Sequence, residues 1–94
     1  MRLVGMAVVH EFLKKHGDVQ DQVEAWATEV REASWQTPAD IKARYASASI
    51  LSENRVVFNL KGNKYRLLAK VSYKLQIVVI NKIGTHADYD NWAL

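Results

Sequence analysis

Hydrophobic residues recur at helical spacing through the first half of the chain and predict three helices there. The first helix ends at Gly17, because glycine readily adopts the backbone conformation of a C-terminal cap. Asp18 is a favourable N-cap for the second helix, which has one clear apolar stripe. That stripe consists of Val19, Val23, Trp26 and Val30. Thr37 and Pro38 then suit the N-cap and the first turn of a third helix over residues 38–45.

After residue 54 the period of the pattern changes to two, which is typical of strands. Strands are predicted over residues 55–60, 64–73 and 76–83. Gly62 lies in the turn between the first two of these strands. A last helical turn is predicted over residues 87–93, with Thr85 as its candidate cap.

The predicted middle strand has one apolar face and one polar face. Its apolar face carries Tyr65, Leu67, Ala69, Val71 and Tyr73, and its polar face carries Lys64, Arg66, Lys70 and Ser72. The apolar run over residues 77–80 predicts burial on both faces of the next strand, and Leu3 and Val4 predict a short opening strand. Helices followed by an antiparallel meander indicate one α+β domain over residues 1–94, in which helices cover the apolar face of a small antiparallel sheet.

Charge is distributed unevenly between the two halves of the chain. Residues 1–53 carry six Lys or Arg against eight Asp or Glu, whereas residues 54–94 carry seven against two. Residues 54–87 contain no acidic residue, and their basic residues are Arg55, Lys61, Lys64, Arg66, Lys70, Lys74 and Lys82. Because a sheet holds cations in fixed geometry, this stretch indicates a surface that binds a polyanion, with nucleic acid as the first partner. The alternative is an ordinary solvated basic face.

Composition excludes several classes of protein. The chain has 94 residues, of which 49% are hydrophobic, which is enough for one core and too short for two domains. It has no Cys, and His10 and His16 lack metal-ligand spacing, so we expect no disulfide, no metal and no cofactor. No apolar stretch approaches the length of a bilayer span, and no leader cleavage site follows the first residues. We therefore expect a cytoplasmic protein without a membrane partner.

Two segments of the second half resemble a known family when they are taken together. The first is VFNLKGNKYRL over Val57–Leu67, and the second is THADYD over Thr85–Asp90. In this order and at this spacing they resemble the HigB-type toxins of bacterial type II toxin–antitoxin systems. The amphipathic N-terminal helices and the stretch Trp35–Pro38 are also similar to that family, so the resemblance covers nearly the whole chain.

The resemblance implies a RelE-like fold, in which helices flank a small antiparallel sheet. It also implies an mRNA interferase that cuts translated mRNA on the ribosome and so inhibits translation. The implied partners are mRNA, the ribosome and a cognate HigA-type antitoxin with a helix-turn-helix DNA-binding domain. Operator DNA is then contacted only through the antitoxin.

The chain contains the residue types that metal-independent RNA cleavage requires. Such an enzyme needs a base for the 2′-hydroxyl, an acid for the leaving 5′-oxygen and cations against the charge that grows on the phosphate. Arg66 can bind phosphate oxygens through two parallel hydrogen bonds, while His86 and Tyr89 are candidates for proton transfer. We therefore expect Arg66, His86 and Tyr89 to be catalytic, and the sequence leaves open which group is the base and which is the acid.

Other polar residues of the same stretch are candidate RNA contacts. They are Asn59, Lys61, Asn63, Lys64 and Lys70. The two asparagines flank a predicted turn, so the alternative is that they satisfy backbone groups there. His86 has an alternative role at the start of the last helix, where Asp88 and Asp90 either complement the helix dipole or orient the imidazole. Trp92 is a candidate contact with a partner.

Two other functions stay open at this point. A nucleic-acid-binding module without catalysis needs only the basic face, with His86 and Tyr89 in structural roles. An interaction domain could use the same face to bind an acidic peptide. A test for RNA cleavage separates both alternatives from the interferase.

Overall fold

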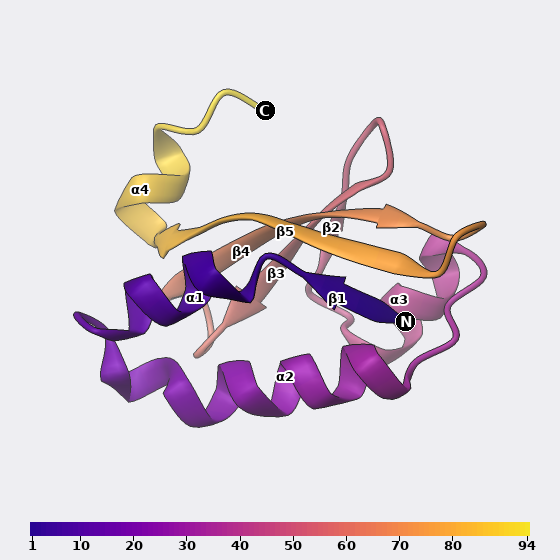
Figure 1. Cartoon of the computed structure of the whole chain (residues 1–94). Helices are drawn as coiled ribbons and strands as arrows, with labels where there is room; N and C mark the ends of the chain where they lie inside the picture. Colours follow the sequence, from indigo (N-terminus) through magenta and orange to yellow (C-terminus); the bar gives the residue numbers. More distant parts are fainter.

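A computed structural model describes residues 1–94 and shows a five-stranded mixed sheet with helices on either side (Figure 1). The strands are β1 (Arg2–Val4), β2 (Ser49–Ile50), β3 (Arg55–Leu60), β4 (Tyr65–Ser72) and β5 (Ile77–Thr85), in the order β1-β5-β4-β3-β2. The helices are α1 (Met6–Leu13), α2 (Gln20–Glu32), α3 (Pro38–Arg44) and α4 (His86–Asp90), with a short 3-10 helix, η1 (Gly17–Val19), before α2. The predicted α+β class is confirmed.

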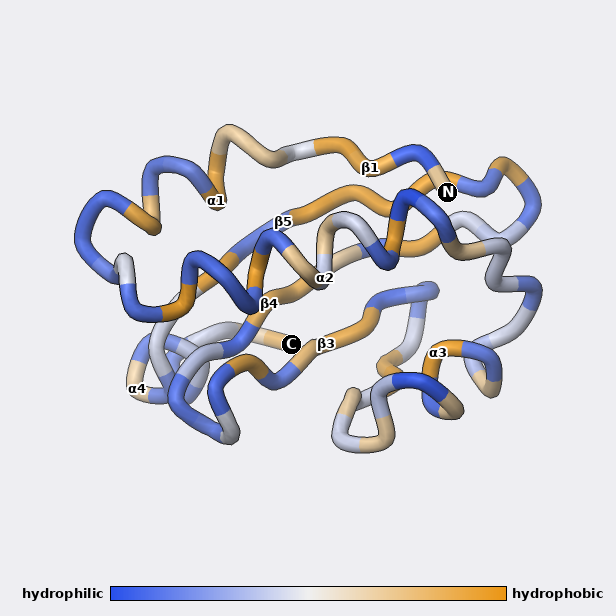
Figure 2. Tube along the Cα trace, turned by 90° about the horizontal axis from the view of Figure 1, so that it is seen from below, coloured by the Kyte–Doolittle hydropathy of each residue, from blue (hydrophilic) through white to orange (hydrophobic).

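Helix α2 packs on one face of the sheet through its predicted stripe. Val19, Val23 and Val30 are fully buried and Trp26 is 2% exposed, and the Trp26 ring meets Phe58 of β3 edge to face at 5.3 Å. Burial of one such valine stabilises the fold by about 1.5–3 kcal/mol. The predicted apolar residues within β4 lie in the same core. Seen from below, α2 lies in front of β4 and β5, with the hydrophobic segment of β3 beside it (Figure 2).

Strand β1 makes the sheet mixed, which the sequence did not predict. It runs parallel to β5, with Leu3 opposite Val78, so the expectation of a purely antiparallel sheet is wrong for this edge. The chain then turns from β1 into α1 at Gly5, whose φ is +102°. A Cβ at this position would lie 2.7 Å from the carbonyl oxygen of Ile80, so only glycine fits between β5 and α1.

The expectation that β5 is buried on both faces is also wrong. Val78 is fully buried and Ile80 is 4% exposed, whereas Val79 between them is 37% exposed. Helices α1 and α2 cover only one face of β5 here, so burial alternates along the strand. The register also shifts after Leu68, which pairs with Lys82 while Ala69 pairs with Ile80, and this leaves Asn81 as a bulge.

The opposite face of the sheet is basic and only partly covered. Cross-strand partners share a face, and the register therefore assigns to this open face Arg55, Val57, Asn59, Arg66, Leu68, Lys70, Val79, Lys82 and Gly84. Figure 1 shows α4 and the C-terminal segment above this face, beside the loop that joins β2 to β3. Arg55 Nη2 donates to the carbonyl oxygen of Leu94 at 3.0 Å. We call this surface the open face.

No helix of the structure combines the length and the apolar character needed to cross a bilayer.

Candidate active site

Arg66 lies at the centre of the candidate site and is nearly buried. It stands on β4 between Asn59 of β3 and Gly84 of β5, and it is 8% exposed. Its Nη1 donates to the carbonyl oxygen of Asn63 at 2.8 Å, and no carboxylate lies within salt-bridge distance of its guanidinium. A buried cation without an anionic partner is costly, so the site is suited to a negatively charged ligand.

Helix α4 places two of the predicted catalytic residues beside Arg66. The ring of Tyr89 packs against the guanidinium, with 5.1 Å from Cζ of Arg66 to the ring centroid. The centroid of the His86 ring is 6.4 Å from that of Tyr89. Nδ1 of His86 lies 3.4 Å from Oδ2 of Asp90, one helical turn further on. The structure therefore places Tyr89 against Arg66 and His86 beside Tyr89, and the catalytic roles of the three residues stay a prediction.

The start of α4 is fixed by Thr85, the cap that the sequence indicated, together with Asp88, which the sequence did not identify as a capping residue. The Asp88 amide donates to Oγ1 of Thr85 at 3.1 Å, and the Thr85 amide donates to Oδ2 of Asp88 at 2.9 Å. The amide of His86 donates to the carbonyl oxygen of Lys64 at 2.9 Å. Thr85 and Asp88 form the cap, so the His86 side chain is not needed for capping. It is 53% exposed and accessible to a ligand.

Gly84, which the sequence did not single out, and Trp92, which it indicated only as a contact with a partner, both belong to the site. Trp92 packs against Tyr89 edge to face at 5.6 Å, and Nζ of Lys82 lies 5.7 Å from the centroid of the Trp92 ring. A Cβ on Gly84 would come within 2.8 Å of Asp88 Cβ and 3.0 Å of the Trp92 ring. Glycine is thus required for α4 to pack closely on β5. Only the adjacency of Gly84 to the THADYD segment hints at this role.

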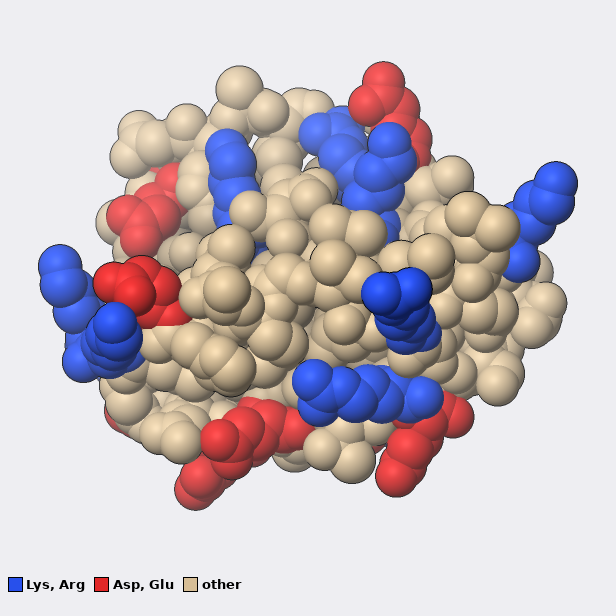
Figure 3. All heavy atoms as spheres, viewed as in Figure 1, with Lys and Arg blue, Asp and Glu red and all other residues tan.

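Asn59 and Lys70 share the open face with Arg66. Asn59 is the cross-strand neighbour of Arg66, and its Nδ2 donates to the carbonyl oxygen of Ser47 at 3.0 Å. Lys70 is exposed and lies four residues further along β4, which corresponds to about 13 Å. In Figure 3, some Lys and Arg side chains lie in the upper part of the molecule, between α4 and the β2–β3 loop, and others are spread over its sides and lower part.

The expected position of Lys64 beside Arg66 on the polar face is wrong. Lys64 precedes β4, and its Nζ donates to Oδ2 of Asp18 at 2.9 Å, while Nζ of Lys61 donates to the carbonyl oxygen of Asp18 at 2.9 Å. Asn63 contributes its carbonyl oxygen to Arg66. The turn after β3 therefore bends toward η1, and two of the predicted phosphate contacts already face a carboxylate.

Asp18 has a different role from the helix cap that the sequence predicted. Its Oδ1 accepts from the Tyr65 hydroxyl at 2.6 Å, and no side-chain cap is made at the start of η1 or α2. The Tyr65 hydroxyl and the Lys64 ammonium lower the pKa of Asp18 to about 2. The carboxylate in turn raises the pKa of Tyr65 above its ordinary value. Asp18 thus joins η1 to the end of the sheet.

The structure contains no group of three or more His, Cys, Asp or Glu side chains with the geometry of a metal site.

Fold and site together define a small α+β protein with a cationic sheet face and an aromatic helix at its end. A family model described as HigB_toxin, the RelE-like toxic component of a toxin–antitoxin system, matches residues 19–92. This span includes the whole candidate site and most of the chain. The chain belongs to the HigB toxin family, which confirms the family that the VFNLKGNKYRL and THADYD segments indicated.

Curated relatives are similar over nearly the full chain. They include the mRNA interferase toxin HigB of Escherichia coli K12 and the mRNA interferase HigB of Shigella flexneri. Each is 24% identical over 92 residues, which cover 96% of this chain and 88% of the relative. As a member of a family of toxic components, the protein has an antitoxin as a partner.

Proposed function

We propose that this toxin is an mRNA interferase, an endoribonuclease that cleaves mRNA at the open face and thereby inhibits translation. The single observation that carries the proposal is Arg66, a cation that is 8% exposed, has no carboxylate partner and lies against Tyr89, whose ring is in turn 6.4 Å from that of the exposed His86. The names of the curated relatives, mRNA interferases, agree with it.

The proposed reaction uses only groups of the chain and of the RNA. The 2′-hydroxyl attacks the adjacent phosphorus, one side chain accepts its proton, and another donates a proton to the departing 5′-oxygen. His86 and Tyr89 are the proposed proton-transfer groups, because Tyr89 lies against Arg66 and the solvent-exposed His86 lies beside Tyr89. The guanidinium of Arg66 binds the phosphate oxygens as their negative charge grows.

The proposed RNA-binding surface extends from Arg66 along the open face. Asn59 is next to Arg66 across the strands, and Lys70 continues the row toward the other end of β4. Lys61, Asn63 and Lys64 lie at the turn beside the site, and we place them at its margin because both lysines contact Asp18.

The proposed partners follow from the same surface and from the family. The ribosome would present translated mRNA to the open face, and the cognate antitoxin would be HigA-type, with a helix-turn-helix domain that contacts operator DNA. The toxin itself would then act in the cytoplasm without touching DNA.

The test is a cleavage assay with purified toxin and a defined mRNA, with and without translating ribosomes. The proposal predicts new 5′ ends in the mRNA when ribosomes are present. Binding of RNA without any cleavage under both conditions would contradict it and favour a passive binding module.

A further inference from the structure

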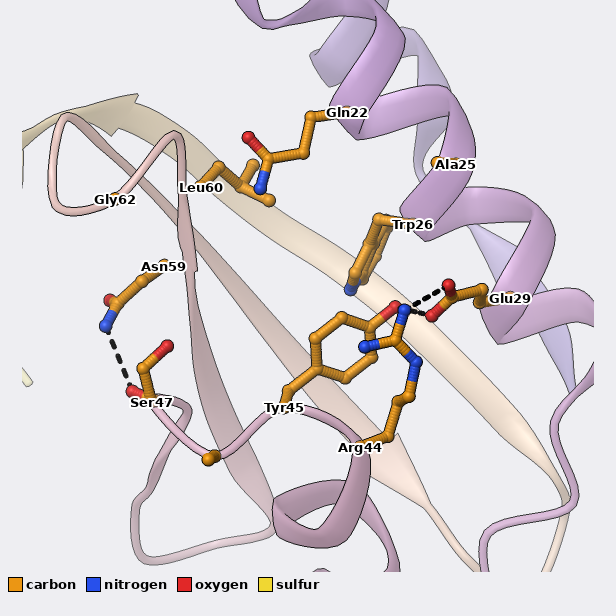
Figure 4. Close-up of a pocket in the computed structure, with 11 residues that line it drawn as sticks. Gln22, Ala25, Trp26, Glu29, Arg44, Tyr45, Ser47, Asn59, Leu60 and Gly62 are labelled. Atoms are coloured by element: carbon orange, nitrogen blue, oxygen red, sulfur yellow. Dashed lines mark hydrogen bonds and ion pairs between the residues drawn. The ribbon is translucent and has the colours of Figure 1, made fainter.

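A cavity whose lining does not include Arg66, His86 or Tyr89 lies between α2, the segment Tyr45–Ser47 and the end of β3. Its volume is about 470 Å³, within the range of small-ligand pockets. Figure 4 shows its polar lining, which includes Gln22, Trp26, Arg44, Ser47 and Asn59. Asn59 is the only one of these residues that also belongs to the open face.

Trp26 presents an unpaired donor to this cavity. The residue is 2% exposed, its Nε1 has no hydrogen-bond acceptor in the protein, and the nitrogen end of the indole points into the cavity (Figure 4). An indole nitrogen only donates, and buried donors are nearly always paired in folded proteins. Because Nε1 is itself enclosed, an acceptor atom of a ligand would pair with it once the side chains that line the cavity move apart.

Two amides add a second donor and an acceptor. Oε1 of Gln22 accepts from the Lys61 amide at 2.6 Å, which leaves Nε2 as a donor on the cavity side. Nδ2 of Asn59 donates to the carbonyl oxygen of Ser47 at 3.0 Å, which leaves Oδ1 as an acceptor. A ligand that matches this lining carries both donors and acceptors along one edge.

Arg44 supplies a planar surface next to these groups. Its guanidinium lies over the Tyr45 ring, with 4.7 Å from Cζ to the centroid, and it donates to Glu29, which also accepts from the Tyr45 hydroxyl. These two donors lower the pKa of Glu29, so the carboxylate balances the charge of Arg44. A guanidinium held in this way can stack on a flat, uncharged ring.

We propose that this cavity binds one unpaired nucleobase of the RNA, outside the phosphate that is cleaved. A nucleobase is planar, uncharged and lined with donors and acceptors, as the cavity requires. The inference rests on the proposed function, and the connection is Asn59, whose Cα lies about 5 Å from that of Arg66 across the antiparallel pair. RNA on the open face can therefore reach the cavity within one or two nucleotides.

The direct test observes the indole N–H signals of Trp26, Trp35 and Trp92 by NMR while adenosine, guanosine, cytidine or uridine is added. The proposal predicts a saturable shift of the Trp26 signal with at least one nucleoside, while the Trp35 signal stays in place. The exposed Ala25 lines the cavity, so Ala25→Leu should fill it and abolish the shift. Thr28→Leu introduces the same side chain at an exposed position of α2 outside the lining, so this control should keep the shift.

Three results would overturn the proposal. They are no Trp26 shift with any nucleoside, a shift that persists in Ala25→Leu, and a shift caused by a capped dipeptide but by no nucleoside.

With RNA, Ala25→Leu should weaken affinity about tenfold, the size of one lost base contact, and Thr28→Leu should bind normally. The same nucleosides can be added to Arg66→Ala, because the NMR measurement does not require cleavage. If this variant is inactive and still shows the Trp26 shift, the cavity binds nucleosides independently of the catalytic site. A failure of the proposed function is thereby distinguished from a failure of the cavity assignment.

Discussion

Arg66 on β4 and Tyr89 on α4 are joined by a cation–π contact, with 5.1 Å between the guanidinium carbon and the ring centroid. This contact connects the only helix above the candidate site to the buried cation below it, and Trp92 supports the same ring from another side. Nη1 of Arg66 donates to the carbonyl oxygen of Asn63, so Nε and Nη2 are the donors that remain for two parallel hydrogen bonds to a phosphate. The position of the Arg66 guanidinium relative to His86 and Tyr89 therefore depends on how α4 packs on β5.

Removal of the proton-transfer groups should slow cleavage without weakening RNA binding. Tyr89→Phe keeps the ring under Arg66 but loses the hydroxyl, and His86→Ala loses the imidazole. A positioned acid or base contributes about a hundred- to ten-thousandfold in rate, so single-turnover cleavage should fall within that range. Thermal melts of the same samples provide the control for folding. If the folded His86→Ala protein cuts at the wild-type rate, the imidazole has only a structural role.

Gly84→Ala should displace α4 and impair the site. The new Cβ would meet Asp88 Cβ at 2.8 Å, so the helix must shift away from β5, at a cost of about 1–3 kcal/mol in the free energy of unfolding. We expect reduced cleavage even in the folded fraction, because Tyr89 moves with α4. Gly17→Ala is the matched control, since no atom lies within 4 Å of the added methyl group and the φ of Gly17 is not positive. Equal activity of the two variants would show that α4 tolerates the shift.

Asp18→Asn should lower the melting temperature in a pH-dependent manner. The pKa of Asp18 in the folded protein is about 2, below the ordinary value of 3.8, so the carboxylate stabilises the fold when it is ionised. This stabilisation is fully present above pH 3.8 and is lost as the pH falls toward 2. The difference in melting temperature between wild type and Asp18→Asn should therefore be constant near neutrality and shrink over this acid window. A difference that grows on acidification would refute the Tyr65 and Lys64 contacts as its source.

Lys70 and Lys64 should differ in their effect on RNA binding. Lys70 is an exposed cation on the open face, so Lys70→Ala should reduce the slope of log affinity against log salt by about one. Lys64 is bound to Asp18, so Lys64→Ala should change the slope less. Lys14, which pairs with Glu11 on α1, provides a control that should leave the slope unchanged. A larger effect of Lys64 than of Lys70 would move the RNA path to the turn after β3.

The local pattern of hydrophobic and polar residues predicted much of the fold. The strand predicted over residues 55–60 coincides with β3, and the stripe of α2 is buried as expected, because both elements present one face to the core. The parallel pairing of β1 with β5 was missed, since it joins opposite ends of the chain and leaves no local periodicity. The exposure of Val79 was missed for a related reason: an apolar run does not reveal that only one face of its strand is covered.

The position of Tyr89 beside His86 agrees with the prediction, whereas the position of Lys64 does not. Tyr89 reaches Arg66 and lies beside His86 because a capped helix follows directly on β5, and Thr85 indicates that helix in the sequence. Strand alternation placed Lys64 with Arg66, but the alternation ends at Tyr65, where β4 begins. The burial of Arg66 has no signal in the sequence, because it arises from α4 and the neighbouring strands together.

Single-turnover cleavage of a translated mRNA by Arg66→Ala and Arg66→Lys tests the central claim most directly. Loss of a preorganised donor at a developing charge costs about a hundred- to a thousandfold in rate, and lysine cannot replace the two parallel hydrogen bonds of the guanidinium. We therefore predict that wild-type protein cuts the mRNA, that Arg66→Ala is slower by at least about a hundredfold, and that Arg66→Lys recovers only part of the loss. Correctly folded Arg66→Ala protein that cuts at the wild-type rate would contradict the assignment of the open face as the active site.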